Sequence, residues 1–354
     1  MVHHWDGKKI KLRGSVMEIS GYVIDVEKAS NEVKKNGYKT VALQIPEGLK
    51  RSVWKIVEFL EKETKAKIIV LADPCFGACD LANYELKNFD VDFVIHIGHT
   101  SIPDIENFWI PTIFINAVSI KDVTAVVEKS LKSLEGNKIG IVTTAQHLHT
   151  LDIVKNVLQK NNFEPIVSKG DKRISEKGQI LGCNFSTGTT IADKVDCFLF
   201  IGSGNFHPVG LLLSSKKPVV AADPYTNTVK KQELDDLKDT ILRQRYGAIA
   251  NSKHAKTFGI LVGIKRGQQR IELATEIKEL LDSFNKKSII IALDQFSPNS
   301  IQGFGGIDCL VSTACPRIAI DDYLQYKIPI LTPVELEIVL GKRKWEDYKF
   351  DQIL

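Results

Sequence analysis

A threefold repeat in the order of segments constrains the fold of this chain more than any other feature. Each repeat opens with a Lys- and Glu-rich helical stretch, followed by a strand, a helix and a second strand. A third strand then begins with an acidic turn, and a fourth strand follows a proline. The helical stretches lie near residues 23–36, 121–134 and 229–246, the first strands at 40–45, 138–142 and 258–262, the acidic turns at Asp92, Asp196 and Asp308, and the prolines at Pro111, Pro218 and Pro329. The interval of roughly 105–120 residues is that of a small doubly wound domain.

The strands of the repeat are short and rich in β-branched residues, as at residues 67–72, 93–97 and 112–115. Near-continuous apolar runs are typical of parallel strands covered on both faces, and their alternation with helices indicates βαβ units. We therefore expect three similar four-stranded α/β domains at residues 1–118, 119–228 and 229–354. Ligands of such sheets bind at the carboxyl ends of the strands, so the loops there are the places to look for chemistry.

Composition excludes several classes of protein. A formal net charge of +4, from 47 basic and 43 acidic residues, is too small to indicate nucleic acid as the main ligand. The first nine residues contain no apolar run like that of a signal peptide, and the longest apolar stretches, such as 289–293, have the length of a strand. We expect a cytoplasmic protein. Its six cysteines are then buried apolar residues, metal ligands or catalytic thiols rather than a disulfide framework.

The repeat sorts the cysteines into two groups. Cys197 and Cys309 occupy equivalent positions in the third strand, where the first repeat has Phe93, so we interpret them as packing residues. Cys79, Cys183 and Cys315 instead follow strands and stand next to small residues. Cys75, four residues before Cys79, is either a spare ligand or a loop residue, and we favour the loop residue.

Three dispersed thiols at strand ends suit a 4Fe–4S cluster with one open iron, although six scattered cysteines can also be unrelated. A structural zinc site is disfavoured, because the chain has no local Cys-x-x-Cys pair and three thiolates are too few ligands.

At these residues the sequence resembles the radical enzymes that start diphthamide synthesis, the 2-(3-amino-3-carboxypropyl)histidine synthases. The matching segments occur in family order and span nearly the whole chain. They are QIPEGL at 44–49, DP at 73–74 with GACD at 77–80, LGC at 181–183, FIGSGNFHP at 200–208 and ACPRIAID at 314–321. The family's cluster cysteines fall on Cys79, Cys183 and Cys315, and Cys75 falls on a position that does not need cysteine.

The resemblance implies three Rossmann-like domains around a central 4Fe–4S cluster, in a homodimer of the archaeal type. It also implies the reaction. Reductive radical cleavage of S-adenosylmethionine at the cluster would transfer the 3-amino-3-carboxypropyl group to a histidine of elongation factor 2, with an external electron donor and without nucleic acid or membrane partners. Two other readings are a non-catalytic iron–sulfur partner or electron-transfer subunit, and a quinolinate-synthase-like enzyme, whose characteristic motifs we do not find.

Four residues are candidates for binding S-adenosylmethionine, each with a simpler structural reading. Gly202 and Gly204 follow a strand and either let a ligand approach the backbone or form a tight turn. His207, close to them, is a ligand contact or a local hydrogen-bond partner. Glu47 stands between a strand and a helix, where its carboxylate contacts the ligand or caps the helix.

Overall fold

The computed structural model describes residues 16–82, 85–105 and 108–354, which form two compact units. The first unit extends to Asp122 and includes residues 145–149, and the second comprises residues 123–144 and 150–354. The start of the chain, on which our expectation about a signal peptide depends, lies outside the described residues. The second unit contains two of the three large sheets, and the predicted domain boundaries at residues 118 and 228 stay predictions.

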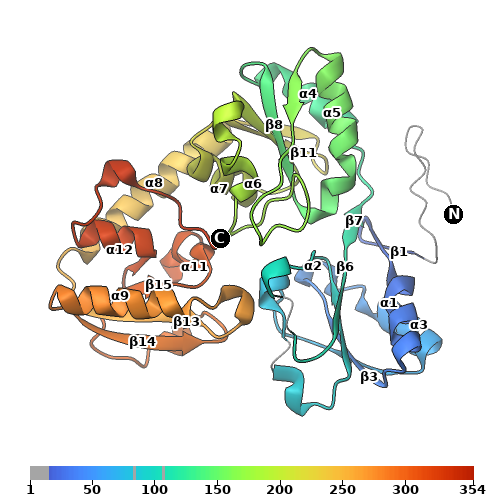
Figure 1. Ribbon diagram of the computed structural model, residues 1–354, viewed down its shortest axis with the longest axis horizontal. Coiled ribbons are helices and arrows are strands. Elements are labelled where there is room, and N and C mark those ends of the chain that lie inside the picture. Colours follow the sequence, from blue (N-terminus) through green and yellow to red (C-terminus); the bar gives the residue numbers. More distant parts are fainter. Residues whose placement is uncertain (1–15, 83–84, 106–107) are drawn as a thin grey trace. The chain divides into compact units, whose positions relative to one another are not determined.

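The first unit, which contains β3 and β6 in Figure 1, is built on a parallel four-stranded sheet. The strand order of this sheet is β4-β3-β5-β6. Its strands are β3 (Thr40–Gln44), β4 (Lys67–Val70), β5 (Phe93–Ile97) and β6 (Thr112–Ile115), and its helices are α1 (Val26–Asn36), α2 (Glu47–Lys50) and α3 (Val53–Thr64). A small antiparallel sheet of β1 (Met17–Ile19), β2 (Tyr22–Ile24) and β7 (Ala117–Ser119), which we did not predict, adjoins them. The first helix consequently begins at Val26 rather than near residue 23, with the Asp25 side chain accepting from the Lys28 N–H at 2.9 Å.

The second unit begins with a five-stranded sheet of order β12-β11-β10-β8-β9. Its strands are β8 (Lys138–Thr143), β9 (Glu164–Ile166), β10 (Cys197–Ile201), β11 (Val219–Asp223) and β12 (Thr228–Lys230), and its helices are α4 (Thr124–Ser130), α5 (Leu151–Lys160), α6 (Ser186–Thr189) and α7 (Phe206–Ser215). Four strands are parallel, as predicted. The fifth, β12, pairs antiparallel to β11 at the edge and was not predicted.

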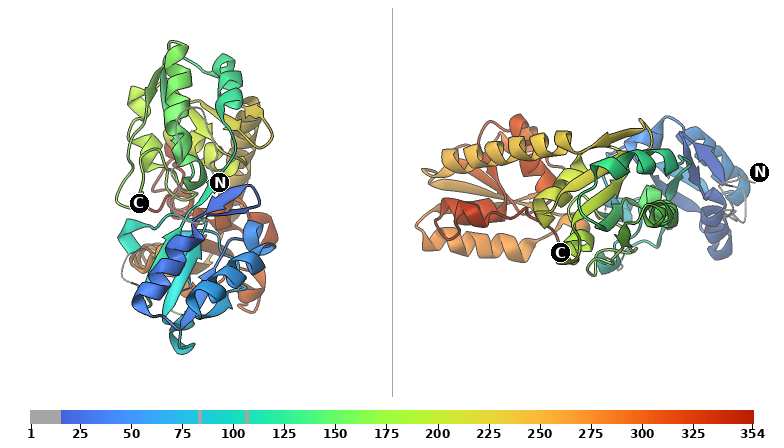
Figure 2. Two further views of the ribbon diagram at one scale, coloured as in Figure 1. Left: turned by 90° about the vertical axis from the view of Figure 1, so that its right-hand side faces the viewer. Right: turned by 90° about the horizontal axis from the view of Figure 1, so that it is seen from above.

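The third sheet is parallel, with the strand order β14-β13-β15-β16. Its strands are β13 (Thr257–Gly263), β14 (Lys287–Leu293), β15 (Cys309–Ser312) and β16 (Ile330–Leu331), and its helices are α8 (Gln232–Ser252), α9 (Ile271–Ser283), α10 (Pro298–Ile301), α11 (Pro316–Ile320) and α12 (Pro333–Val339). Figure 2 shows α8, in yellow, as one continuous helix, which extends past the predicted end near residue 246. It packs against both α7 and α12.

All three sheets share one strand order, in which the first strand of the repeat lies between the second and the third. The acidic turn explains part of this regularity. In each sheet the aspartate before the third strand accepts the backbone N–H groups at the start of the first strand. The pairs are Asp92 with Lys39 and Thr40 at 2.7 and 2.9 Å, Asp196 with Asn137 and Lys138 at 2.8 and 2.9 Å, and Asp308 with Lys256 and Thr257 at 2.8 and 3.0 Å.

We call this arrangement the Asp clamp. The donated hydrogen bonds lower the pKa of Asp196 and of Asp308, because they stabilise the ionised carboxylate.

The prediction of a parallel α/β fold with three repeats is confirmed. Among the described residues, no helix is both long enough and apolar enough to cross a membrane.

Candidate functional site

The loop that carries Cys79 is held in place by the neighbouring strand. Cys79 lies in the short 3-10 helix Ala78–Asp80, after β4. The buried Asp80 accepts the Phe76 N–H at 3.1 Å through its carboxylate, and its own N–H donates to the Gly77 carbonyl at 3.0 Å. Gln44, at the end of β3, donates from Nε2 to the Asp80 carbonyl at 2.8 Å. The loop is therefore closed on itself and tied to the sheet, while the Cys79 side chain stays partly exposed.

Glu47 does not cap the helix it begins. The N-cap position of α2 is Pro46, and Glu47 is the first helical residue. Its carboxylate pairs with Lys50, whose Nζ also donates to the Ala72 carbonyl at 2.7 Å and to the Asp73 carbonyl at 3.0 Å. The interpretation of Glu47 as the helix cap is wrong. Contact between Glu47 and S-adenosylmethionine stays a prediction.

Cys183 lies in a turn that is built around the buried Asn184. Leu181 and Asn184 form an isolated antiparallel bridge, which places Cys183 within a tight reversal of the chain. Asn184 donates from Nδ2 to Asp171 at 2.9 Å and accepts the Ser186 N–H and O–H at 3.0 and 2.6 Å. Cys183 itself is buried. The turn belongs to a long segment after β9, so the correspondence with the loop of Cys79 that we predicted is topological rather than exact in length.

Cys315 directly follows β15 and is the N-cap residue of α11, whose first helical residue is Pro316. The Arg270 guanidinium donates to the Ala314 carbonyl at 3.0 Å and to the Thr313 carbonyl. Arg317, two residues after the cysteine, lies over the Phe206 ring, with its Cζ 3.6 Å from the ring centroid. A Cβ at Gly182 would approach that same ring to 2.8 Å, so the glycine before Cys183 permits the close packing of Phe206.

The C-terminal segment connects the loops of Cys183 and Cys315. The Ile353 N–H donates to the Cys183 carbonyl at 2.9 Å, and the Phe185 N–H donates to the Gln352 side chain at 2.8 Å. Arg270 pairs with Asp351 at 2.7 Å while its other bonds hold the backbone before Cys315. Two of the three predicted ligand loops thus belong to one hydrogen-bonded network. This segment carries no recognisable motif, so its role could not be predicted from the sequence.

Replacing Arg270 with glutamine should lower the free energy of unfolding by about 2–3 kcal/mol, because its charged hydrogen bonds are lost. Urea denaturation measures this loss. Arg343, whose pair with Glu337 is more exposed, supplies the control: Arg343→Gln should cost less than about 1 kcal/mol. Equal losses in the two variants would contradict the special role of Arg270.

The stability deficit of the Arg270→Gln variant should also depend on pH. Burial raises the pKa of Asp351, whereas the charge and hydrogen bond of Arg270 lower it. Without the guanidinium, the pKa of Asp351 should therefore rise further. An acid whose folded-state pKa is raised takes up its proton more readily in the folded protein, so stability is gained as the pH falls through that pKa. The deficit should therefore shrink in acid, which denaturation curves at several pH values can check.

Gly202 and Gly204 form the turn after β10. Their φ angles are 152° and 76°, so the backbone favours glycine at both positions. Packing also favours it at Gly202, where a Cβ would approach the Phe200 ring to 2.9 Å. The tight-turn reading is therefore supported. His207 is half-buried, and its ring stacks on Phe200 with an interplanar angle of 7°. Burial, assisted by the charge of Arg317, lowers the pKa of His207 to about 4, so the imidazole is neutral near pH 7.

Cys197 and Cys309 are fully buried in the cores of the second and third sheets, as predicted. Burial raises the pKa of both thiols, to about 12 for Cys309, whose Sγ lies 3.3 Å from the Ser252 hydroxyl. Such thiols are poor ligands, because binding requires the thiolate.

The third cysteine outside the predicted ligand set, Cys75, is also buried, but it lies in a loop near two histidines. His96 is in β5 and His99 follows that strand, and burial lowers the pKa of His99 to about 4. The sequence favoured Cys75 as a loop residue and did not connect it with His96 or His99. The spacing of two histidines at a strand end was the signal that could have linked them.

The chemistry of the predicted ligands fits an iron–sulfur cluster. Cys79, Cys183 and Cys315 lie in loops that follow strands, next to Ala78, Gly182 and Ala314. Iron–sulfur clusters are bound by cysteine thiolates, and three of them leave one iron of a 4Fe–4S cluster open to a substrate.

Comparisons with known proteins identify the family of this chain. Residues 45–349 match the family model of diphthamide synthesis proteins. The 2-(3-amino-3-carboxypropyl)histidine synthase of Pyrococcus horikoshii is 38% identical over 91% of this chain and 91% of its own length. The enzyme of that name from Methanocaldococcus jannaschii is 31% identical over 93% of both chains. The crystal structure of Dph2 from Pyrococcus horikoshii with a 4Fe–4S cluster is 35% identical, has a TM-score of 0.85 and covers 96% of this chain and 95% of its own. The chain therefore belongs to the diphthamide synthesis protein family.

Proposed function

We propose that this protein transfers the 3-amino-3-carboxypropyl group of S-adenosylmethionine to a histidine of elongation factor 2, the first step of diphthamide synthesis. It is a transferase, and its cofactors are a 4Fe–4S cluster and S-adenosylmethionine as co-substrate. Family membership and the names of the archaeal relatives support the reaction. The structural support for the proposal is the network of hydrogen bonds and one ion pair that joins the loops of Cys183 and Cys315.

The residues of this chain have distinct parts in the proposed site. Cys79, Cys183 and Cys315 would hold the cluster, which when bound supplies the electron that cleaves the bond from sulfur to the aminocarboxypropyl arm. Arg270 and the C-terminal segment fix the backbone on either side of two of these ligands, and such positioning is worth several kcal/mol in catalysis of this kind.

Side chains next to Cys183 and Cys315 pack against one another, because Arg317 lies over the Phe206 ring and Gly182 leaves space for that ring. The neutral His207 offers one ring N–H and one lone pair to a polar ligand. The turn at Gly202 and Gly204 lies at the carboxyl end of β10, where ligands of parallel sheets bind. We include Gly202, Gly204, His207 and Glu47 in the proposed binding site for S-adenosylmethionine.

Incubating the protein anaerobically with S-adenosylmethionine and dithionite should yield methylthioadenosine, with no 5′-deoxyadenosine. The aminocarboxypropyl carbon, not the adenosyl carbon, must lie in line for cleavage, and orienting it is a contribution of the protein. Chromatography of the nucleosides measures the result. A non-catalytic cluster protein would release neither nucleoside, and 5′-deoxyadenosine as the main product would contradict the proposed reaction.

Adding archaeal elongation factor 2 to the same incubation tests the protein substrate separately. One histidine should gain roughly 101 Da, the mass of the transferred group less one hydrogen, which the chemistry of the cofactor determines. Methylthioadenosine without a mass gain would support the cleavage but contradict the substrate. A homodimer, an external electron donor and a cytoplasmic location complete the proposal as predictions from the sequence.

A further inference from the structure

We propose that Cys75, His96 and His99 form a second metal site, separate from the cluster ligands, that binds one Zn²⁺ ion. The three donor atoms all lie within 4.8 Å of one another. His96 Nε2 is 3.9 Å from Cys75 Sγ and 2.9 Å from His99 Nδ1. Two imidazoles and a thiol thus converge on one point inside the first unit. Cys79, the predicted cluster ligand of the same loop, is not a member of this group.

The fold brings the three residues together through the two strands that flank β3. Cys75 lies in the loop after β4, and His96 is in β5, on the opposite side of β3 in the sheet. His99 follows Gly98, whose φ of 95° reverses the chain so that the His99 ring returns toward His96. A Cβ at position 98 would lie 2.7 Å from the Pro46 ring, so this turn also depends on glycine for space.

Gln44 fixes the tautomer of His96 in the form that a metal requires. The Gln44 amide donates from Nε2 to the Asp80 carbonyl at 2.8 Å, so its Oε1 must be the atom that faces His96 Nδ1 at 3.0 Å. An amide oxygen only accepts hydrogen bonds, so His96 carries its proton on Nδ1. The lone pair of Nε2 therefore points toward Cys75 and His99. Metal-binding histidines generally have such a hydrogen-bond partner on the second ring nitrogen.

The donor set selects the kind of ion. A thiolate with two imidazoles suits Zn²⁺, whereas Mg²⁺ and Ca²⁺ prefer oxygen ligands. Tetrahedral zinc would place the two nitrogens about 3.3 Å apart and the sulfur about 3.6 Å from each nitrogen. The two distances from His96 Nε2 differ from these by about 0.4 Å or less, and the distance between the Cys75 and His99 donor atoms is at most 4.8 Å. Rotations of the side chains can supply the difference. Three protein ligands leave the fourth position to water or to a polar ligand.

Cobalt binding to the full-length protein with its iron–sulfur cluster already assembled tests the proposal, because the cluster then occupies its own cysteines. Anaerobic addition of Co²⁺ should produce a thiolate-to-cobalt charge-transfer band and intense ligand-field bands that saturate at one equivalent per chain. Zn²⁺ should remove them by competition. Cys75→Ser should abolish the charge-transfer band, and His99→Ala should weaken Co²⁺ binding at least about tenfold.

His254→Ala is the matched control, because His254 is exposed and remote in sequence from the three ligands. This variant should bind Co²⁺ like the wild type. Iron content, measured in every variant, verifies that the protein is folded and that the cluster is unchanged. A charge-transfer band that survives in the Cys75→Ser variant would overturn the proposal. So would a wild-type protein that binds no Co²⁺, since the three side chains would then form only a hydrogen-bonded cluster.

Discussion

Replacing Cys315 with alanine is expected to remove the iron–sulfur cluster and to reduce methylthioadenosine formation to background. The variant would leave only two of the three proposed thiolate ligands. The position is unusual structurally, since the cysteine is both the residue that ends the loop after β15 and the N-cap of α11. Iron analysis and the visible spectrum of the anaerobic protein measure the cluster, and chromatography measures the product. We expect the same outcome for Cys79→Ala and Cys183→Ala.

Cys309→Ala is the control for this experiment, because it removes a thiol six positions earlier on the same strand and loop. Cys309 is fully buried and its Sγ contacts the Ser252 hydroxyl, so its loss should affect packing alone. The variant should retain about four irons per chain and lose roughly 1–2 kcal/mol of stability. If Cys309→Ala lost its iron while Cys315→Ala kept it, our assignment of the third ligand would be wrong.

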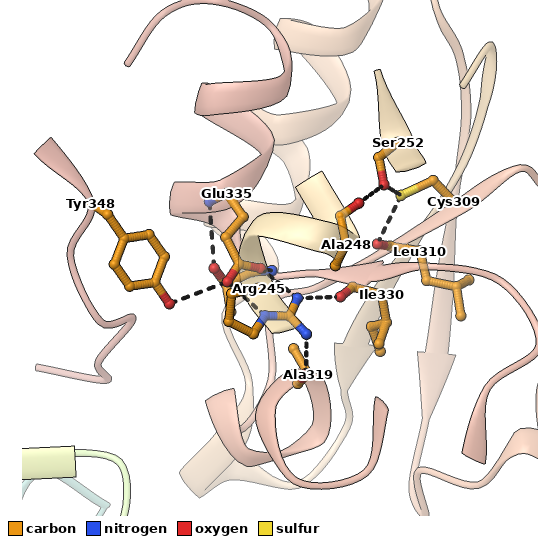
Figure 3. Close-up of polar contacts among 10 residues, drawn as sticks. Arg245, Ala248, Ser252, Cys309, Leu310, Ala319, Ile330, Glu335 and Tyr348 are labelled. Carbon is orange, nitrogen blue, oxygen red and sulfur yellow. Dashed lines mark hydrogen bonds and ion pairs between the residues drawn. The ribbon is translucent and has the colours of Figure 1, made fainter. Parts of the chain in front are cut away.

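Replacing Arg245 with methionine is expected to lower the free energy of unfolding by about 3–5 kcal/mol, the largest stability effect that we predict. Both partners of the pair between Arg245 and Glu335 are fully buried. Arg245 donates from Nε and Nη2 to the two carboxylate oxygens at 2.8 and 2.7 Å (Figure 3). Without it, Glu335 would be left as a buried charge whose remaining side-chain donor is the Tyr348 hydroxyl at 3.2 Å. Denaturant unfolding measures the change.

A double variant separates the cost of an unpaired charge from the value of the pair. Replacing both residues with methionine removes the buried charges together, and such replacements are often neutral or stabilising. The double variant should therefore recover much of the stability that Arg245→Met loses. Arg245 also donates to the Ile330 carbonyl at 2.6 Å and to the Ala319 carbonyl, which lies in α11. We expect the single variant to hold less cluster as well, because Cys315 is the N-cap residue of α11. A loss below 1 kcal/mol would contradict the assignment of this pair as a main support of the third sheet.

Much of the fold could be predicted because its signals are local. Runs of β-branched residues located the strands of the three parallel sheets, and the acidic turns marked where each third strand begins. The small sheet of β1, β2 and β7 was missed, because strands of three residues are too short to show a periodic pattern. The edge strand β12 was missed for the same reason.

The candidate site was predictable only where the repeat or a family motif marked its residues. The buried positions of Cys197 and Cys309 followed from their equivalence to Phe93. Contacts between distant segments gave no such signal: Arg270 and Asp351 are 81 positions apart, and nothing in their neighbours indicates that they pair. His96 looked structural, because a histidine within a buried strand usually is. Only the structure shows Cys75 and His99 beside it.

The Asp clamp, present at the same turn of all three sheets, satisfies the same backbone N–H groups three times. The edge at which each first strand begins is thus fixed in one way throughout the chain. The cysteines did not follow this pattern. Cys79 and Cys183 come after the second strand of their sheets, whereas Cys315 comes after the third. The three repeats therefore share the contact that fixes where their first strands begin, while the residues proposed to bind the cluster occupy different places in different repeats.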